Sequence, residues 1–218
     1  MIARDGFPFI LSFLILSGIL LWLSIRFDSR WLLSLGALST VIFCIVLFFF
    51  RDPDRVAPTD PMVFVSPADG RIVSVDTIPN HSFVGNQAQR IVIFLSPFDV
   101  HINRFPCDGK VEGVNYTAGK FLAAYADGID SLNERNEMLI QTTHGPISVV
   151  QIAGFLARRI VCRAQTGQQA IRGERFGMIK FSSRTDLILP HDARIIVKPG
   201  MKVRGGESIL AHAQGGAR

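Results

Sequence analysis

The chain has 218 residues, a formal net charge of +5 and a sequence pI of about 9.5. This length suits one ordinary domain with a membrane anchor and leaves little room for two large domains. The positive charge favours an anionic partner such as lipid headgroups, whereas dispersed basic residues without interleaved aromatics disfavour nucleic acid. Cys44, Cys107 and Cys162 lack the spacing of a disulfide framework or a zinc site, so we expect a reducing compartment and no metal.

Two uncharged apolar runs open the chain, Phe7 to Ile25 and Trp31 to Phe50. Each is close to the roughly 20 residues that a helix needs to cross a bilayer core. The connector between them, Arg26 to Arg30, is so short that it predicts a helical hairpin with both ends on one side of the membrane. We therefore predict a transmembrane hairpin anchor over residues 1–55, followed by a second domain over 56–218.

Two other interpretations of these runs are weaker. A signal peptide is disfavoured because no small-residue cleavage site follows the first run and a second apolar run comes directly after it. A buried hairpin in a soluble core is disfavoured because two uncharged runs of this length are rare there. Arg4, Arg51 and Arg55 slightly outnumber Arg26 and Arg30 in the connector, which places the second domain in the cytoplasm.

The rest of the chain reads as short strands between turns and predicts a mainly β (α+β) domain. Helical patterns are limited to Phe121–Tyr125 and Arg172–Gly177. Period-two alternation or a short buried apolar run predicts strands at Val63–Val65, Arg71–Val75, Ile91–Leu95, Ile147–Ala153, Ile160–Cys162, Leu187–Leu189 and Arg194–Val197.

The C-terminal stretch Val197–Ala211 spaces its glycines and apolar residues as in a lipoyl- or biotinyl-type hammerhead, a small β-sandwich. Glycines at such corners permit sharp turns between very short strands. Met201-Lys202 is superficially similar to the carrier lysine of those domains. However, it precedes the Gly205-Gly206 turn instead of occupying a hairpin tip, so a structural corner is the favoured interpretation.

The segment from Arg172 to Asp186, with the sequence RGERFGMIKFSSRTD, resembles the self-cleavage segment of the phosphatidylserine decarboxylases in their short membrane-anchored form. The resemblance covers most of the chain, from Arg51-Asp52-Pro53 to the hammerhead. It implies an enzyme that converts phosphatidylserine to phosphatidylethanolamine and CO2. The family usually has glycine before its reactive serine, and this chain has Ser182 there.

The resemblance also implies how the cofactor arises. Ser183 Oγ would attack the carbonyl of Ser182, and cleavage between these two residues would turn residue 183 into a pyruvoyl group. That carbonyl would form a Schiff base with the serine headgroup and act as an electron sink, the role of pyridoxal phosphate in other enzymes. Residue 183 is thus catalytic and also the source of the cofactor, with no metal required.

The stretch Ser96–Pro106, with the sequence SPFDVHINRFP, resembles the histidine motif of the family. His101 is the candidate proton-transfer group, because an imidazole changes protonation near neutral pH. Asp69, in the turn Ser66–Gly70, matches a family aspartate that orients the histidine during processing, although an ordinary Asp-Gly turn explains it equally well. The other histidines, at 81, 144, 191 and 212, have no motif around them.

Three arginines are candidate substrate-binding residues. Arg104 stands where long members of the family carry a further histidine, so their Asp-His-Ser arrangement does not transfer directly; its guanidinium suits a lipid phosphate or the substrate carboxylate. Arg158 and Arg184 are the other two. Arg135 and Arg159 offer similar phosphate chemistry, or simply a solvated charged surface.

From the resemblance we expect four further properties: a membrane phospholipid substrate, association of the two cleaved fragments, a homo-oligomer, and a cell (inner) membrane location with the catalytic domain facing the cytoplasm. A diacyl lipid and an archaeal-type ether lipid with the same headgroup stay open as substrates. Two alternatives also stay open. One is a membrane-anchored, non-enzymatic hammerhead adaptor or carrier, and the other is a decarboxylase precursor whose maturation Ser182 stalls.

Overall fold

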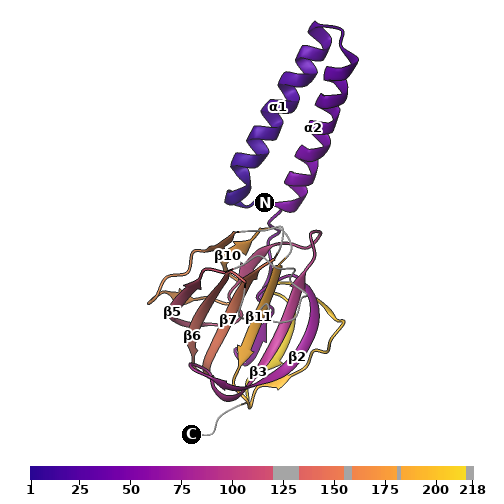
Figure 1. The fold of residues 1–218 in the computed structure, drawn as a ribbon. Coiled ribbons are helices and arrows are strands. Elements are labelled where there is room, and N and C mark those ends of the chain that lie inside the picture. The colour runs from indigo at the N-terminus through magenta and orange to yellow at the C-terminus, as the bar shows by residue number, and fades with distance from the viewer. Residues whose placement is uncertain (120–132, 155–158, 181–182, 215–218) are drawn as a thin grey trace. The chain divides into compact units, whose positions relative to one another are not determined.

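The computed structural model describes residues 1–119, 133–154, 159–180 and 183–214, and the chain forms two compact units. The first, Met1–Asp54, is a helical hairpin, and the second, Arg55–Arg218, is built almost entirely of strands (Figure 1). The predicted combination of a mainly β domain with two N-terminal apolar helices is confirmed.

The hairpin consists of a short 3-10 turn, η1 (Arg4–Gly6), and the helices α1 (Phe7–Arg26) and α2 (Arg30–Phe49). Ser29 caps the second helix, since its side chain accepts from the Leu32 N–H at 3.5 Å. The helices approach closely at Gly36, where an added Cβ would lie 2.8 Å from a methyl of Leu21. The two predicted runs therefore form the expected antiparallel pair.

The apolar side chains of this hairpin are mostly uncovered. Only 11% and 22% of the most hydrophobic windows of the two helices are buried, although both helices are long and apolar enough to cross a membrane. Trp22 and Trp31, on either side of the connector, are 64% and 84% exposed. Exposed apolar surface of this extent fits a membrane anchor better than a soluble core.

The second unit contains fourteen strands within the described residues. Their bounds are β1 (Val63–Val65), β2 (Gly70–His81), β3 (Gly85–Leu95), β4 (Ile102–Arg104), β5 (Gly109–Thr117), β6 (Arg135–Thr142), β7 (Gly145–Ala153), β8 (Ile160–Cys162), β9 (Gln169–Ala170), β10 (Arg175–Ile179), β11 (Ser183–Leu189), β12 (Arg194–Ile195), β13 (Lys202–Val203) and β14 (Ile209–His212).

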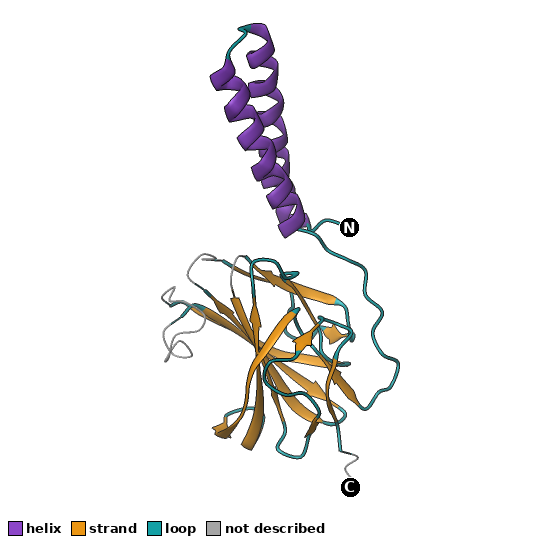
Figure 2. Cartoon of the chain, turned by 90° about the vertical axis from the view of Figure 1, so that its right-hand side faces the viewer, coloured by secondary structure: helices purple, strands orange, loops and turns teal. Residues whose placement is uncertain are grey.

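These strands form one long sheet and two short ones. The long sheet has eight strands in the order β13-β2-β3-β11-β7-β6-β5-β9, and the short sheets have the orders β4-β10-β8 and β1-β14-β12. Every pairing is antiparallel, and β11 lies in the interior of the long sheet between β3 and β7 (Figure 1). In Figure 2 the strands cross the domain in different directions, because the long sheet curls over the short ones.

The main core fills the space inside this curl. Along β11, Leu187 and Leu189 face the core, and Ile188 faces the other side of the sheet, as period-two alternation requires. Two large aromatic side chains from the short-sheet side, Phe105 and Phe176, pack at a tilt of 40° with their ring centroids 5.2 Å apart. The apolar runs that predicted strands thus lie in β3, β7 and β11, and alternate residues of each run face the main core.

Three local predictions need comment. The helix predicted at Arg172–Gly177 is wrong, because Arg175–Ile179 is strand β10. An added Cβ at Gly177 would lie 2.3 Å from the Val161 carbonyl, so glycine here lets β8 approach and pair, which a local pattern cannot reveal. The strand predicted over Arg194–Val197 shortens to Arg194–Ile195. The helix predicted at Phe121–Tyr125 lies outside the described residues.

Arg172 fastens the segment 55–61 to the β domain. Its guanidinium donates to the carbonyls of Pro58, at 2.9 Å, and Asp60, and it lies 3.4 Å from the carboxylate of Asp108. The side chain is only 6% exposed. At the start of the same segment, Arg55 forms ion pairs with Asp69 at 2.9 Å and Glu207 at 2.8 Å.

Replacing Arg172 with methionine is expected to lower the free energy of unfolding of this domain by about 2–4 kcal/mol, because the segment 55–61 loses its hydrogen bonds to a nearly buried guanidinium. Thermal unfolding of the purified protein in detergent measures the change. Lys198→Met removes an exposed cation and serves as the control, with no shift expected. An unfolding midpoint of Arg172→Met equal to that of the parent would show that the contacts of Arg172 with segment 55–61 do not stabilise the domain.

Candidate active site

Ser183 opens strand β11, where it pairs with Leu95 on β3 and with Ala153 on β7. The residue is completely buried, and its Oγ has no hydrogen-bond partner among the described residues. A buried hydroxyl left in this state costs about 1–3 kcal/mol, so it calls for a functional explanation. The serine singled out by the sequence is therefore a rigidly held, unsolvated hydroxyl.

His101 directly precedes β4 and is also completely buried. Its Nδ1 lies 2.9 Å from the carbonyl oxygen of Asp99. A carbonyl only accepts, so Nδ1 carries the hydrogen, and Nε2 is the basic nitrogen of the neutral ring. The Asp99 carboxylate in turn accepts from the N–H and Oγ of Ser96, at 2.8 and 2.7 Å, which closes the loop that carries the histidine.

The topology brings Ser183 and His101 to the same end of the long sheet. Strand β3 ends at Leu95, the register partner of Ser183, and His101 follows six residues later. The His101 carbonyl accepts from the Ile179 N–H at 3.2 Å. Ile179 precedes Ser183 by four residues, which places their Cα atoms within roughly 14 Å. Ser182, the other predicted cleavage residue, lies outside the described residues.

Asp69 lies in the turn that supports the strand after His101. Its Oδ1 accepts from the Gly205 N–H at 2.7 Å and its Oδ2 from Arg55 at 2.9 Å. In the same turn, the carbonyl of Pro67 accepts from the Arg104 N–H at 2.9 Å. These contacts hold the turn against β4. Orientation of His101 by Asp69 stays a prediction.

Arg104 is 4% exposed, and its Nη1 donates to the carbonyl of Gly173 at 2.9 Å. Gly206, which has a φ of 80°, leaves room for this side chain, since an added Cβ would lie 2.8 Å from Arg104 Cδ. Arg104 thus joins two glycine turns, one of which leads into β10. A role in binding the substrate phosphate or carboxylate stays a prediction.

Arg184 forms a bidentate ion pair with Asp186, at 2.7 and 2.6 Å. Because side chains alternate along β11, this pair lies on the outer face of the sheet together with Ile188. Ser183 lies on the other face, toward the core. Substrate binding by Arg184 stays a prediction, and Arg158, its partner in that prediction, lies outside the described residues. Arg135 lies in β6 and lines a cavity of about 200 Å³ on the same outer face as Ile188.

That small outer-face cavity also contains the pair His81 and Glu137, whose Nε2 and Oε1 atoms are 2.9 Å apart. The hydrogen bond from His81 holds the pKa of the Glu137 carboxyl below its ordinary value, and a second bond from Ser148 Oγ acts in the same direction. Positive and negative side chains balance here. We therefore interpret the charged residues that line this cavity as a structural ion-pair cluster.

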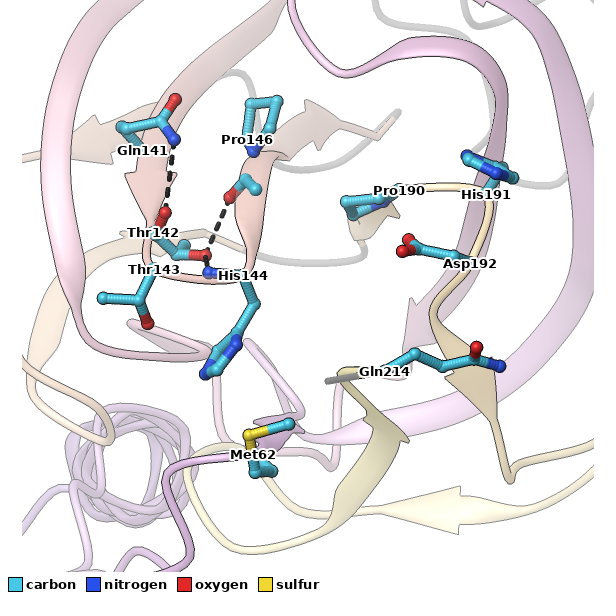
Figure 3. Close-up of a pocket in the computed structure, with 11 residues that line it drawn as sticks. Met62, Gln141, Thr142, Thr143, His144, Pro146, Pro190, His191, Asp192 and Gln214 are labelled. Atoms are coloured by element: carbon cyan, nitrogen blue, oxygen red, sulfur yellow. Dashed lines mark hydrogen bonds between the residues drawn. The ribbon is translucent and has the colours of Figure 1, made fainter. Parts of the chain in front are cut away.

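A cavity of about 630 Å³ lies far from Ser183. It is lined by the β6–β7 hairpin and by Pro190, His191 and Asp192, which follow the opposite end of β11 (Figure 3). His144 projects from the hairpin into this region and none of the predicted site residues lines it. Within the described ranges, no three His, Cys, Asp or Glu side chains gather to hold a metal ion.

The sequence did not reveal a set of buried polar residues beside the site, namely Asn103, Asn136, Gln151 and Thr185. One signal was available. Asn103 follows His101 by two residues and Thr185 follows Ser183 by two, and residues at this spacing share a face of an extended strand.

An apolar helical hairpin ahead of a β domain, with a serine and a histidine buried at one end of the sheet, is an arrangement that suits a membrane-associated β-rich enzyme. Residues 43–211 match the family model for phosphatidylserine decarboxylase. The chain is 40% identical over 211 residues to the phosphatidylserine decarboxylase proenzyme of Syntrophus aciditrophicus, with 96% of each chain covered. It is 44% identical over 175 residues to that of Chlorobium phaeobacteroides, with 80% of this chain and 81% of the relative covered. The chain therefore belongs to the phosphatidylserine decarboxylase family of carboxy-lyases, as the resemblance predicted.

Proposed function

We propose that this chain is a proenzyme that cuts itself between Ser182 and Ser183 and then decarboxylates phosphatidylserine to phosphatidylethanolamine. The observation that carries the proposal is the buried Ser183 hydroxyl without a hydrogen-bond partner among the described residues. It lies within the part of the chain that matches the family. The name proenzyme, which both relatives bear, supports a precursor that matures.

Self-cleavage needs only groups of the chain itself and one water. Ser183 Oγ adds to the carbonyl carbon of Ser182, and the C–N bond breaks, so that an ester replaces the peptide bond and residue 183 gains a free amine. Loss of the Cα proton of residue 183 then breaks the Cβ–Oγ bond, leaving a carboxylate on Ser182 and dehydroalanine at 183. The imine tautomer of dehydroalanine takes up one water and releases one ammonia, which leaves a pyruvoyl group.

His101 is the residue we assign to the proton transfers. Two protons must leave during cleavage, one from Ser183 Oγ and one from its Cα. The Asp99 carbonyl holds the Nδ1 hydrogen of His101, which leaves Nε2 as the proton acceptor. Burial of the imidazole keeps water from competing for that nitrogen.

The surroundings of Ser183 fit a pyruvoyl group formed in place. Strands β3 and β7 hold the backbone of this residue from both sides, so the new carbonyl, which forms on the former Cα of residue 183, would arise at a fixed place in the sheet. When formed, the group would supply an electrophilic carbonyl that draws electrons from the serine headgroup as CO2 leaves. His101 is then the nearest assigned group able to hold or return a proton.

The hairpin suggests where the enzyme works. A phospholipid with two acyl chains stays in the bilayer, so an anchored enzyme avoids extracting it. We propose that the chain sits in the cell inner membrane with the β domain facing the cytoplasm, on the charge balance of Arg4, Arg51 and Arg55 against Arg26 and Arg30. We also propose that the two cleaved fragments stay together, because β10 and β11, on either side of the cut, share one core.

The carrier alternative finds little support. Lys202 lies within β13, where it pairs with Arg71 on β2, and not at the tip of a hairpin. A precursor stalled by Ser182 is a real alternative, because a side chain at that position restricts the backbone freedom that glycine gives the family.

Intact mass spectrometry under denaturing conditions tests the proposal. We expect two species that divide between Ser182 and Ser183. The smaller species should be lighter by one ammonia than the fragment 183–218 that simple hydrolysis of the peptide bond would give. It should also react with a hydrazide. The cleaved protein should then release CO2 from vesicles that contain phosphatidylserine.

Other outcomes separate the parts of the proposal. If the chain is intact and Ser182→Gly restores cleavage, Ser182 stalls maturation. If the Ser182→Gly chain is also intact, the self-cleavage proposal is wrong. If the chain is cut but releases no CO2 from phosphatidylserine, the substrate is a different one, and an ether lipid with the same headgroup is the next to assay.

A further inference from the structure

Four buried polar side chains form a continuous hydrogen-bonded chain inside the β domain. Asn136 Nδ2 donates to Gln151 Oε1 at 3.1 Å, and Gln151 Nε2 donates to Asn103 Oδ1 at 2.9 Å. Asn103 Nδ2 then donates to Thr185 Oγ1 at 3.2 Å. The exposed fractions of these residues are 3% for Asn136 and 0% for the other three.

Three members of this chain are neighbours across the long sheet. Asn136 on β6 pairs with Gln151 on β7, and Gln151 pairs with Thr185 on β11. Asn103 comes from β4, in one of the short sheets. Its side chain therefore links the short sheet to the long one by hydrogen bonds to Gln151 and Thr185.

A glycine in the short sheet leaves room for the hydrogen bond between Asn103 and Gln151. Asn103 pairs with Gly177 on β10, and a Cβ added at Gly177 would lie 3.0 Å from Gln151 Nε2. Any larger residue there would push the Gln151 amide away from Asn103. The glycine thus serves the polar chain as well as the approach of β8.

Asn103 and Thr185 lie next to the two predicted reacting residues along their strands. The bond from the Ile179 N–H to the His101 carbonyl continues the β4–β10 ladder by one residue, so His101 and Asn103 share a side of an extended segment. Ser183 and Thr185 share the core side of β11. The Asn103–Thr185 bond therefore joins the two strands one side-chain repeat, about 7 Å, from the two predicted reacting groups.

Stability alone does not explain the polar chain. Burying amide and hydroxyl groups in a core costs free energy that their hydrogen bonds only offset, and apolar side chains of similar volume would hold the sheets together as well. A hydrogen-bonded set has one satisfied geometry, whereas apolar packing tolerates small shifts. What the polar set adds is a fixed register between β4 and β11.

We propose that Asn103, Gln151 and Thr185 are positioning residues, which hold His101 at a fixed place relative to Ser183 so that self-cleavage can proceed. This inference rests on the proposed function. Asn103 acts through His101, Thr185 acts through Ser183, and Gln151 fixes the orientation of the Asn103 amide. None of them touches the substrate.

Thr185→Val tests the inference, because valine keeps the shape of threonine and removes the hydroxyl that accepts from the Asn103 amide, which keeps only its longer bond to the Pro67 carbonyl, at 3.4 Å. In full-length precursor made by cell-free synthesis with detergent, we expect its self-cleavage to be about 10- to 100-fold slower than in the parent. Thr185→Ser, which retains the hydroxyl, should restore the rate to within about threefold of the parent. Mass spectrometry of timed samples measures both.

Thr142→Val is the matched control. Thr142 is buried, accepts from the His144 N–H at 2.9 Å and donates to the Gly145 carbonyl at 2.7 Å, at the far end of the sheet. Its loss should lower the unfolding midpoint at least as much as Thr185→Val and leave cleavage at the parent rate. Midpoints are compared in a Ser183→Ala background, so that every sample is uncut.

Three outcomes overturn the inference. In the first, Thr185→Val cleaves at the parent rate. In the second, it slows no more than Thr142→Val of equal stability, so that the effect is one of stability. In the third, Thr185→Ser fails to restore the rate, so that the effect is one of packing. A failure of the proposed function looks different, because the parent and its Ser182→Gly variant would then both stay uncut, and the positioning role would fall with it.

Discussion

Replacing Ser183 with alanine is expected to leave the chain at its full precursor mass and to reduce CO2 release from phosphatidylserine vesicles to the assay background. The variant lacks the only atom that can open the peptide bond before residue 183 in the proposed chemistry, and it also lacks the Cβ–Oγ bond whose elimination leads to the pyruvoyl group. Both losses follow from one oxygen atom. The effect is therefore all-or-none in mass and activity alike.

A second consequence concerns stability. Ser183 Oγ has no hydrogen-bond partner among the described residues, so the alanine variant gives up no bond to any of them and removes a buried hydroxyl. We expect the uncut Ser183→Ala chain to unfold at a temperature equal to or above that of an uncut parent chain trapped early after synthesis. A functional group kept at some expense of stability behaves in this way.

Two further variants sharpen the Ser183 experiment. Ser148→Ala removes another completely buried hydroxyl, one that donates to Glu137 at 2.8 Å, and it should leave cleavage unchanged. Ser182→Ala distinguishes the two adjacent serines, since a nucleophile at 182 would divide the chain after Phe181. Fragments from Ser183→Ala that end at residue 182 would indicate a nucleophile elsewhere or an external protease.

The elements that the sequence predicted well are those set by local hydrophobicity. The two uncharged runs became α1 and α2 nearly residue for residue, and Ile91–Leu95 became the buried end of β3. The position of Ser183 came from a resemblance and not from periodicity, because a Ser-Ser pair has no pattern of its own. Ser183 is buried because β3 and β7 lie on either side of it. Its burial, and the absence of a hydrogen-bond partner among the described residues, therefore depend on the fold and cannot be predicted from the local sequence.

The errors and omissions share a physical cause, which is dependence on distant partners. A local pattern cannot show that Gly177 serves close approach to Val161, so the pattern alone predicts a helix there. The charge of Arg104 predicts substrate binding, which stays a prediction, but it does not reveal that the guanidinium also donates to the carbonyl of Gly173. Asn103 and Gln151 look like surface polar residues until the fold joins them across 48 positions of sequence.

Replacing His101 with alanine is expected to slow self-cleavage by about 100- to 10,000-fold, the usual contribution of a positioned general base. The Asp99 carbonyl fixes the Nδ1 hydrogen, so the neutral ring presents Nε2 as a base without any rearrangement. Timed mass spectra of freshly made precursor measure the rate. His144→Ala is the matched control, because His144 lines the cavity at the far end of the sheet, and it should cleave like the parent.

Added imidazole separates chemistry from packing in the His101→Ala chain. The substitution leaves an imidazole-sized space in a buried site, and free imidazole that enters it should restore part of the cleavage rate in proportion to its concentration. A loss caused by misfolding would not respond to imidazole. If His101→Ala cleaves at the parent rate, the base is another group, and the contact between His101 and Asp99 serves only to close the loop after β3.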